Sequence, residues 1–293
     1  MCITSEEINT QPSLWRRALN EIGPARDTIV ASGERVLTIG CGTSAYIASS
    51  YAQIRERSGH GTTDAGPASE PRAWRDWDRV VAISRSGQTS EVLHALRNLP
   101  AGMRKVVVTA DPSSPAAQLA DDVLDLSWAD EASIVPTRFP TTFLIQARAA
   151  LGHNIKSVAL QAEKAVASPL PVRVQDFSHF VFLGANWAYG LAQEAALKMR
   201  EVAQAWTESY HLYDYRHGPI AVADERSLVW MLGSTDETLA GDIRATGASV
   251  VLGTRDPLVD LILAQRMAVQ IAESNGLDPD APRWASRSVI LAS

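Results

Sequence analysis

The stretch RVLTIG (residues 35–40) is a short apolar run that ends in glycine, and it decides the fold class of this chain. RVVAIS (79–84), KVVVTA (105–110) and DVLDL (122–126) repeat the pattern, and amphipathic stretches separate these runs. Short buried strands that alternate with helical patterns are typical of βαβ units and of a parallel sheet covered on both faces. The sequence therefore predicts an α/β fold.

The same alternation begins again in the second half of the chain. A helical stretch from about 140 to 167 leads into SPLPVRVQD (168–176), where two prolines mark a linker. The further apolar runs are HFVFLGA (179–185), SLVWMLGS (227–234) and SVVLGT (249–254). The repeated frame predicts an internal duplication, with a first domain at 1–170 that includes an N-terminal helix and a second domain at 171–293.

The composition excludes several classes of function. The 293-residue chain is 46% hydrophobic and 20% charged, which suits a globular protein of two domains. Its formal charge is −6 and it has no basic run, so we expect no nucleic-acid partner. Cys2 and Cys41 form no disulfide framework, and the histidines show no metal-ligand spacing. The acidic N-terminus and the lack of a long apolar run predict a cytoplasmic protein without a membrane partner.

Two loops in the first half could hold a phosphate group. GCGTSA (40–45) and SRSGQTSE (84–91) each follow an apolar run and precede a helical pattern. Backbone N–H groups at a helix N-terminus favour an anion, and Ser84, Ser86 and Thr89 can each donate to a phosphate oxygen. The alternative interpretation is ordinary helix capping by Thr89 or Ser86, and a single loop does not decide between the two.

GCGTSA also fits the G-x-G-x-x-A pattern of dinucleotide-binding proteins. That pattern needs an acidic residue about 20 positions further on, at the end of a second strand. Asp64 is the nearest candidate, and it lies in GHGTTDAGPAS (59–69), which shows no strand pattern. We therefore expect no nicotinamide cofactor.

The second half contains a charged stripe on a predicted helix, EAALKMRE (194–201). At about 100° per residue, Glu194, Lys198 and Glu201 lie within about 60° of one another. Such a stripe is either a solvated face with ordinary ion pairs or part of a site. His217, which precedes a Gly-Pro turn, is a candidate general acid or base because its ordinary pKa lies near neutrality.

Five motifs in this order resemble the two-domain sugar isomerase (SIS) module. They are CGTS (41–44), SRSGQTSE (84–91), EAALKMRE (194–201), RHGP (216–219) and PRWASRSVIL (282–291). The likeness is greatest to the isomerase half of glucosamine-6-phosphate synthase and to its stand-alone relatives, the phosphosugar isomerases and amino-sugar-6-phosphate deaminases. It implies two tandem SIS domains, each a three-layer α/β/α flavodoxin-like parallel sheet, and no metal or organic cofactor.

The resemblance also implies roles for individual residues. Glu201 matches the base that moves a proton between C1 and C2, Lys198 the amine at the C1 oxygen, and His217 the histidine that opens the sugar ring. His217 would come from the neighbouring subunit, which implies a homodimer. Glu194 is expected to be a helix-surface or pairing residue. The residues that match substrate-binding positions are Thr43, Ser44, Ser84, Arg85 (through its backbone), Ser86, Thr89, Thr137 and Arg287.

The sequence departs from the synthase pattern at several places, including YDYRHGP (213–219) where the family has GELKHGP. Cys2 resembles the start of a glutaminase half, yet it leads straight into the isomerase module, so we do not expect glutamine-dependent aminotransferase activity. Arg287 stands where the synthase has a lysine, and an arginine stays protonated and forms no Schiff base. Residues 136–138 read PTR in place of STK beside the sugar, so the sequence does not assign the sugar.

The prediction for function is therefore a phosphosugar isomerase or deaminase. It would interconvert an aldose or amino-sugar 6-phosphate, similar to glucosamine 6-phosphate, and a ketose 6-phosphate by proton transfer between C1 and C2. The alternative is a non-catalytic SIS sensor that binds a sugar phosphate. A sensor has no need of Glu201, Lys198 and His217 together.

Overall fold

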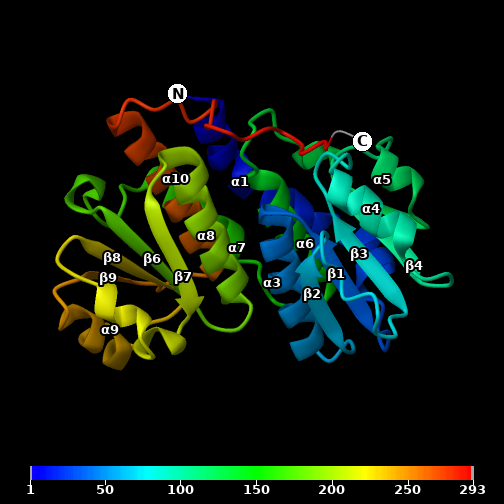
Figure 1. Cartoon of the computed structure of the whole chain (residues 1–293), viewed down its shortest axis with the longest axis horizontal. Helices are drawn as coiled ribbons and strands as arrows, with labels where there is room; N and C mark the ends of the chain where they lie inside the picture. Colours follow the sequence, from blue (N-terminus) through cyan, green and yellow to red (C-terminus); the bar gives the residue numbers. More distant parts are fainter. Residues whose placement is uncertain (1, 292–293) are drawn as a thin grey trace. The chain divides into compact units, whose positions relative to one another are not determined.

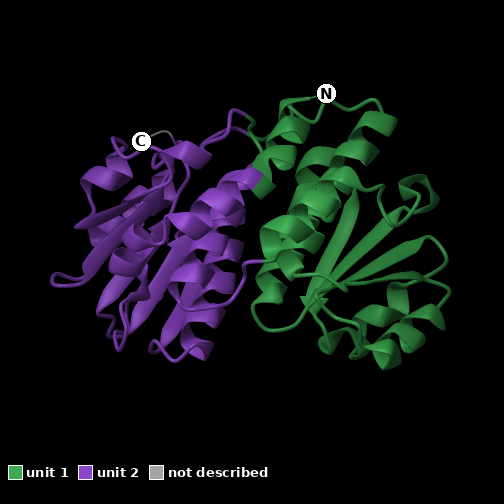
Figure 2. Ribbon diagram, turned by 180° about the vertical axis from the view of Figure 1, so that it is seen from behind, with its two compact units in different colours: residues 1–12, 133–135, 157–285 green, residues 13–132, 136–156, 286–293 purple. Residues whose placement is uncertain are grey.

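The computed structural model describes residues 2–291 and divides the chain into two compact units, coloured separately in Figure 2. Unit 1 comprises residues 1–12, 133–135 and 157–285, and unit 2 comprises residues 13–132, 136–156 and 286–293. This division differs from the predicted boundary at residue 170. Helix α7 (Val158–Ala167), which we expected in the first domain, packs against α10 (Pro257–Ser274) in unit 1.

Unit 2 contains a five-stranded parallel sheet (Figure 1). Its strands are β1 (Val36–Gly40), β2 (Thr63–Pro67), β3 (Arg79–Ile83), β4 (Arg104–Thr109) and β5 (Asp122–Asp125). The strand order is β2-β1-β3-β4-β5, and every neighbouring pair is parallel. This is the order of flavodoxin-like folds, in which ligands bind at the carboxyl ends of the strands.

Helices cover both faces of the unit 2 sheet. On one face, Leu37 and Ile39 of β1 share an apolar cluster with Val92 of α4 (Ser90–Asn98). On the other face, α3 (Thr43–Arg57) contacts β1 and β2 and packs against α6 (Arg138–Ala150). Every residue of β1 and β3 is buried. Alternate side chains of a strand point to opposite faces, so both faces of the sheet carry apolar side chains. The predicted three-layer α/β/α arrangement is confirmed.

Unit 1 contains a four-stranded parallel sheet with the order β7-β6-β8-β9. Its strands are β6 (His179–Gly184), β7 (Trp206–His211), β8 (Ser227–Leu232) and β9 (Ser249–Leu252). Helix α9 (Glu237–Arg244) shares a core cluster with Val181 and Val229, whereas α8 (Ala188–Ala203) packs against both the sheet and α10. The order matches unit 2 without its last strand, which fits the predicted duplication.

Three local predictions were wrong. The segment around Asp64 forms β2, and a strand that we did not expect, β7, follows α8; both are edge strands with partly exposed side chains. The expected helix at 140–167 is two helices, because α6 ends at Ala150 and Gly152 adopts a φ of +90°, which favours glycine.

The remaining helices are shorter or lie at the start of the chain. They are α1 (Ile3–Asn20), α2 (Gly23–Ala25), the π-helix η1 (Arg26–Val30), α5 (Pro115–Gln118) and the 3-10 helices η2 (Ser127–Ala129), η3 (Val174–Asp176), η4 (Asp214–Arg216) and η5 (Pro219–Val222). Between residues 2 and 291, no helix is long and apolar enough to cross a membrane. The same residues contain no cluster of three or more His, Cys, Asp or Glu side chains that could hold a metal ion.

Candidate functional site

The loop between β3 and α4 contains the residues that we predicted to bind phosphate. Ser84, Arg85 and Ser86 are all buried, and the loop is fixed to the end of β4. The backbone N–H of Ser84 donates to the carbonyl of Val108 at 2.9 Å, and the carbonyl of Arg85 accepts from the N–H of Ala110 at 2.9 Å. Two backbone hydrogen bonds therefore tie this loop to the carboxyl end of β4.

Gly87 lets the same loop approach its neighbours closely. Its φ is +60°, and a Cβ atom at this position would lie 2.0 Å from Oγ of Ser114. Only glycine fits both the left-handed conformation and the short distance. The backbone N–H groups that begin α4 are held beside this tight turn.

The structure bears on the choice between capping and anion binding. Thr89 is the N-cap residue of α4, but within residues 2–291 its side chain makes no capping hydrogen bond. Oγ of Ser84 is buried and has no hydrogen-bond partner in the same part of the chain. In unit 1 the equivalent helix, α9, is capped by Asp236, whose Oδ1 accepts from the N–H of Leu239 at 2.9 Å. Within the described residues, ordinary helix capping therefore accounts for neither of these two unit 2 hydroxyls.

The loop between β1 and α3 contains the predicted sugar-contacting residues Thr43 and Ser44. Helix α3 begins at Thr43, which is buried, whereas Ser44 is partly exposed. A Cβ atom on Gly40 would lie 2.6 Å from the carbonyl carbon of Ser44, so the close approach of the end of β1 to the start of α3 also needs glycine. Both candidate loops lie at the carboxyl ends of neighbouring strands, β1 and β3.

The reason that we gave against a dinucleotide site needs correction, because Asp64 does lie on a strand. It is the second residue of β2, however, and pairs in register with Leu37 near the amino end of β1. Its carboxylate forms ion pairs with Arg72 at 2.8 Å and with Arg75 at 3.0 Å. A ribose-binding carboxylate stands at the opposite end of its strand.

Two further predicted substrate residues contact acidic residues that the motifs did not reveal. Thr137 is buried, and its hydroxyl donates to Oε2 of Glu131 at 3.0 Å. Arg287, in the C-terminal segment of unit 2, forms an ion pair with Asp130 at 2.7 Å. A lone acidic pair in the sequence WADEAS carries no motif, so no signal in the sequence pointed to Asp130 and Glu131.

In unit 1, helix α8 carries the charged stripe. Nζ of Lys198 lies 2.5 Å from Glu201 and 3.4 Å from Glu194. Lys198 and Glu194 are fully buried, whereas the side chain of Glu201 is 26% exposed. The surface interpretation of Glu194 was therefore wrong, although its pairing role is confirmed. Helix α8 ends at Ala203, and Trp206 lies exposed at the start of β7.

The environment of Lys198 favours its charged form. Burial lowers the pKa of an amine, but the negative charges of Glu194 and Glu201 raise it more, so the pKa of Lys198 lies above its ordinary value. The side chain is therefore an ammonium group at neutral pH. In this form it can donate a hydrogen bond or stabilise a negative charge.

His217 follows η4 in a separate segment of unit 1. It is exposed, and its backbone N–H donates to the carbonyl of Asp214 at 2.9 Å. Gly218 adopts a φ of +124°, and buried Tyr215 anchors the turn from the other side. The backbone position of His217 is therefore restricted by this turn, while its side chain is exposed.

Comparison with known proteins identifies part of the chain. A family model described as the SIS domain matches residues 29–151, which include both candidate loops of unit 2. These residues belong to the SIS domain family. The match begins just before β1 and ends just after α6, so it covers the whole sheet of unit 2.

Similar proteins extend the likeness over both units. The chain is 28% identical to a glutamine–fructose-6-phosphate aminotransferase (isomerizing) of Methanothermobacter thermautotrophicus, over 98% of this chain and 57% of that protein. It therefore spans little more than half the length of the curated relatives that it matches. It is also 26% identical to the crystal structure of a glucosamine-6-phosphate deaminase from Thermotoga maritima, with a TM-score of 0.83 over 98% of this chain and 99% of that one.

A third likeness concerns the fold alone. A putative tagatose-6-phosphate ketose/aldose isomerase from Clostridium novyi has a TM-score of 0.82 and 20% identity over 99% of this chain and 94% of that one. The tandem arrangement of two parallel sheets is thus found in solved structures of about the same length.

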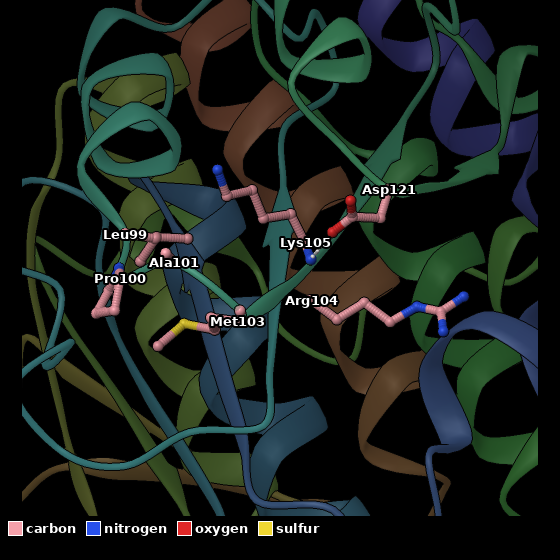
Figure 3. A pocket seen from close by; sticks show the side chains of 8 residues that line it. Leu99, Pro100, Ala101, Met103, Arg104, Lys105 and Asp121 are labelled. Atoms are coloured by element: carbon pink, nitrogen blue, oxygen red, sulfur yellow. Dashed lines mark hydrogen bonds between the residues drawn. The ribbon is translucent and has the colours of Figure 1, made fainter.

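A hollow of about 450 Å³ lies at the other end of the SIS domain sheet (Figure 3). Residues 99–105 and Asp121 line it, and Oδ2 of Asp121 accepts from the N–H of Lys105 at 2.7 Å. Arg104 begins β4, so the hollow is at the amino end of the strand, away from the two candidate loops. It contains none of the predicted site residues.

Proposed function

We propose that this protein is a phosphosugar isomerase or amino-sugar-6-phosphate deaminase. It interconverts an aldose or amino-sugar 6-phosphate, similar to glucosamine 6-phosphate, and a ketose 6-phosphate. With an amino sugar, the proton transfer leaves an imine at C2, which takes up water and releases ammonia to give the ketose. The reaction needs a phosphate cradle, a group that opens the ring, a base for the proton at C2, and a donor for the oxygen at C1.

The observation that carries the proposal is the buried Lys198 beside the partly exposed Glu201 on α8. Glu201 has a carboxylate that a ligand can reach, and it is held within 2.5 Å of an ammonium group. In the proposed reaction Glu201 takes the proton from C2 and returns it to C1, through a cis-enediol or an enolamine. Lys198 stabilises the negative charge that develops on the C1 oxygen.

The phosphate group is proposed to bind at the N-terminus of α4. The hydroxyls of Ser84, Ser86 and Thr89, together with the backbone N–H of Arg85, are the proposed donors. Two features support this site: Thr89 makes no capping hydrogen bond inside the described chain, and the buried hydroxyl of Ser84 lacks a partner there. Thr43 and Ser44, from the neighbouring loop, are proposed to contact the sugar.

Ring opening is proposed to fall to His217. A histidine can act as an acid and as a base near neutral pH, and the turn at Gly218 restricts its backbone. The proposal includes a homodimer in which His217 serves the site of the neighbouring subunit, and it includes a cytoplasmic location. Thr137 and Arg287 complete the proposed surroundings of the substrate.

A panel of sugar phosphates assayed by proton NMR in deuterated water tests the proposal. Glucose, fructose, glucosamine and tagatose 6-phosphates would each be incubated with the protein, and fructose 6-phosphate would also be tested with ammonia. We expect deuterium at C1 or C2 and a new sugar in at least one sample. Binding of a sugar phosphate without deuterium incorporation would instead indicate a sensor, and no binding at all would refute the proposal.

A further inference from the structure

A buried carboxylate outside the predicted motifs holds the start of α6. Glu131 is only 2% exposed, and its Oε2 accepts from the N–H groups of Thr137 at 2.8 Å and Arg138 at 3.0 Å. Oε1 accepts from the N–H of Phe139 at 3.2 Å. Thr137 is the N-cap residue, yet among the described residues its side chain makes no capping hydrogen bond. Glu131 therefore satisfies the N-terminus of α6 from outside the helix.

The same carboxylate faces the phosphate loop. Oε1 of Glu131 lies 3.8 Å from Nη1 of Arg85, and both side chains are buried. The backbone of Arg85 is held as well, since its carbonyl accepts from the hydroxyl of Thr109 at 3.0 Å. A buried charge that loses its counter-charge is costly, so this pair fixes the distance between the loop and α6.

The C-terminal segment of unit 2 meets the two residues at the same place. Arg287 donates to the backbone carbonyl of Glu131, and its Nη2 lies 2.7 and 2.8 Å from the two carboxylate oxygens of Asp130. The carbonyl of Arg287 in turn accepts from Nη2 of Arg85 at 3.4 Å. Arg85, Thr137 and Arg287, which come from three separate segments, therefore converge on Glu131.

Resting on the proposed function, we propose that Glu131 is a positioning residue for the sugar phosphate. It acts through Arg85, whose backbone N–H is a proposed phosphate donor, and through Thr137. Its carboxylate oxygens already accept four hydrogen bonds and face a guanidinium, so it does not need to touch the ligand. Without its charge the phosphate loop would relax away from the geometry that binds phosphate.

The test compares Glu131→Gln with a matched control, Glu34→Gln. Glu34 also pairs with a buried arginine of unit 2, Arg79, at 2.7 Å, but Arg79 begins β3 at the amino end of the sheet. Both variants should be less stable than the wild type in thermal unfolding. Only Glu131→Gln should weaken the binding of glucosamine 6-phosphate and of inorganic phosphate, by about tenfold in calorimetry, the factor for one lost hydrogen bond to a charged group.

An unchanged dissociation constant in Glu131→Gln, or an equal loss in Glu34→Gln, would overturn the inference and leave the proposed function intact. A wild-type protein that binds neither ligand would overturn both. If Glu131→Gln does not fold, Arg85→Gln breaks the same pair from the other side while keeping the backbone N–H, and it should weaken binding by a similar factor. The double variant, Glu131→Gln with Arg85→Gln, should bind phosphate no more weakly than the weaker of the two single variants. If its loss of affinity equalled the product of the two single losses, the two residues would act independently, which would overturn the inference.

Discussion

Replacing Glu194 by glutamine should destabilise unit 1, because it removes one of the two negative charges around a buried amine. At 3.4 Å and an effective dielectric constant of 20, the attraction between Glu194 and Lys198 is about 5 kcal/mol. Burying the carboxylate offsets part of this attraction, and Lys198 keeps Glu201 at 2.5 Å. We therefore expect Glu194→Gln to lower the free energy of unfolding by about 2 kcal/mol at pH 7.

The substitution should also change how stability depends on pH. In the wild type, burial lowers the pKa of Lys198 but the two carboxylates raise it more, so its pKa in the folded state lies above the ordinary 10.5. The stability from this group is present below pH 10.5 and is lost as the pH rises through the folded-state pKa. Because Glu194→Gln removes one of the raising charges, the alkaline loss of stability should begin at a lower pH.

Urea unfolding followed by circular dichroism between pH 7 and pH 11 measures both effects. Glu237→Gln is the control, since Glu237 pairs with Arg244 at 2.9 Å on α9 but both side chains are exposed. The control should lose less than about 0.5 kcal/mol. If Glu194→Gln lost no more than the control, the buried triad would not have the energetic importance that its geometry indicates.

Three further predictions concern other parts of the chain. Ser86→Ala combined with Thr89→Ala should weaken calorimetric binding of a sugar phosphate at least tenfold, from the loss of about 1.5 kcal/mol or more, and an unchanged dissociation constant would remove the loop from the site. Gly87→Ala should lower the free energy of unfolding by about 2 kcal/mol in urea, because its φ is +60° and the new Cβ would clash with Ser114; a loss below about 0.5 kcal/mol would contradict this. Burial raises the pKa of Asp260 to about 7 from 3.8, so the wild type loses stability as the pH rises through this range. Asp260→Asn should remove that slope and be more stable than the wild type at pH 8, and an unchanged slope in urea titrations would refute the assignment.

Most of the fold could be predicted from the sequence, because each buried parallel strand is a short run of apolar residues. RVLTIG, RVVAIS and HFVFLGA became β1, β3 and β6 to within about a residue at each end. The edge strands β2 and β7 were not predicted, because a strand with one free edge is partly exposed and needs no continuous apolar run. The β2 sequence TDAGP contains a glycine and a proline, which are uncommon in strands. The β7 sequence WTESYH consists mostly of polar residues and has no apolar run.

The site was predicted only as far as motifs and helical spacing reach. The spacing of EAALKMRE correctly placed Lys198 beside Glu201, because side chains three apart on a helix are neighbours. It could not show that Glu194 is buried, since burial depends on tertiary packing, and α8 packs against both the sheet and α10. Glu131 was missed for a similar reason: its partners are Arg85 and the start of α6, and no local pattern connects these segments.

If Glu201 is the base, Glu201→Gln should stop proton transfer and leave sugar-phosphate binding intact. With a sugar phosphate that the wild type accepts, this variant should bind within about threefold of the wild type, since the proposed phosphate donors are unchanged. Exchange of the C2 proton in deuterated water, followed by proton NMR, should fall at least about a hundredfold. Exchange at the wild-type rate in a variant that still binds the sugar phosphate would show that Glu201 is not the base.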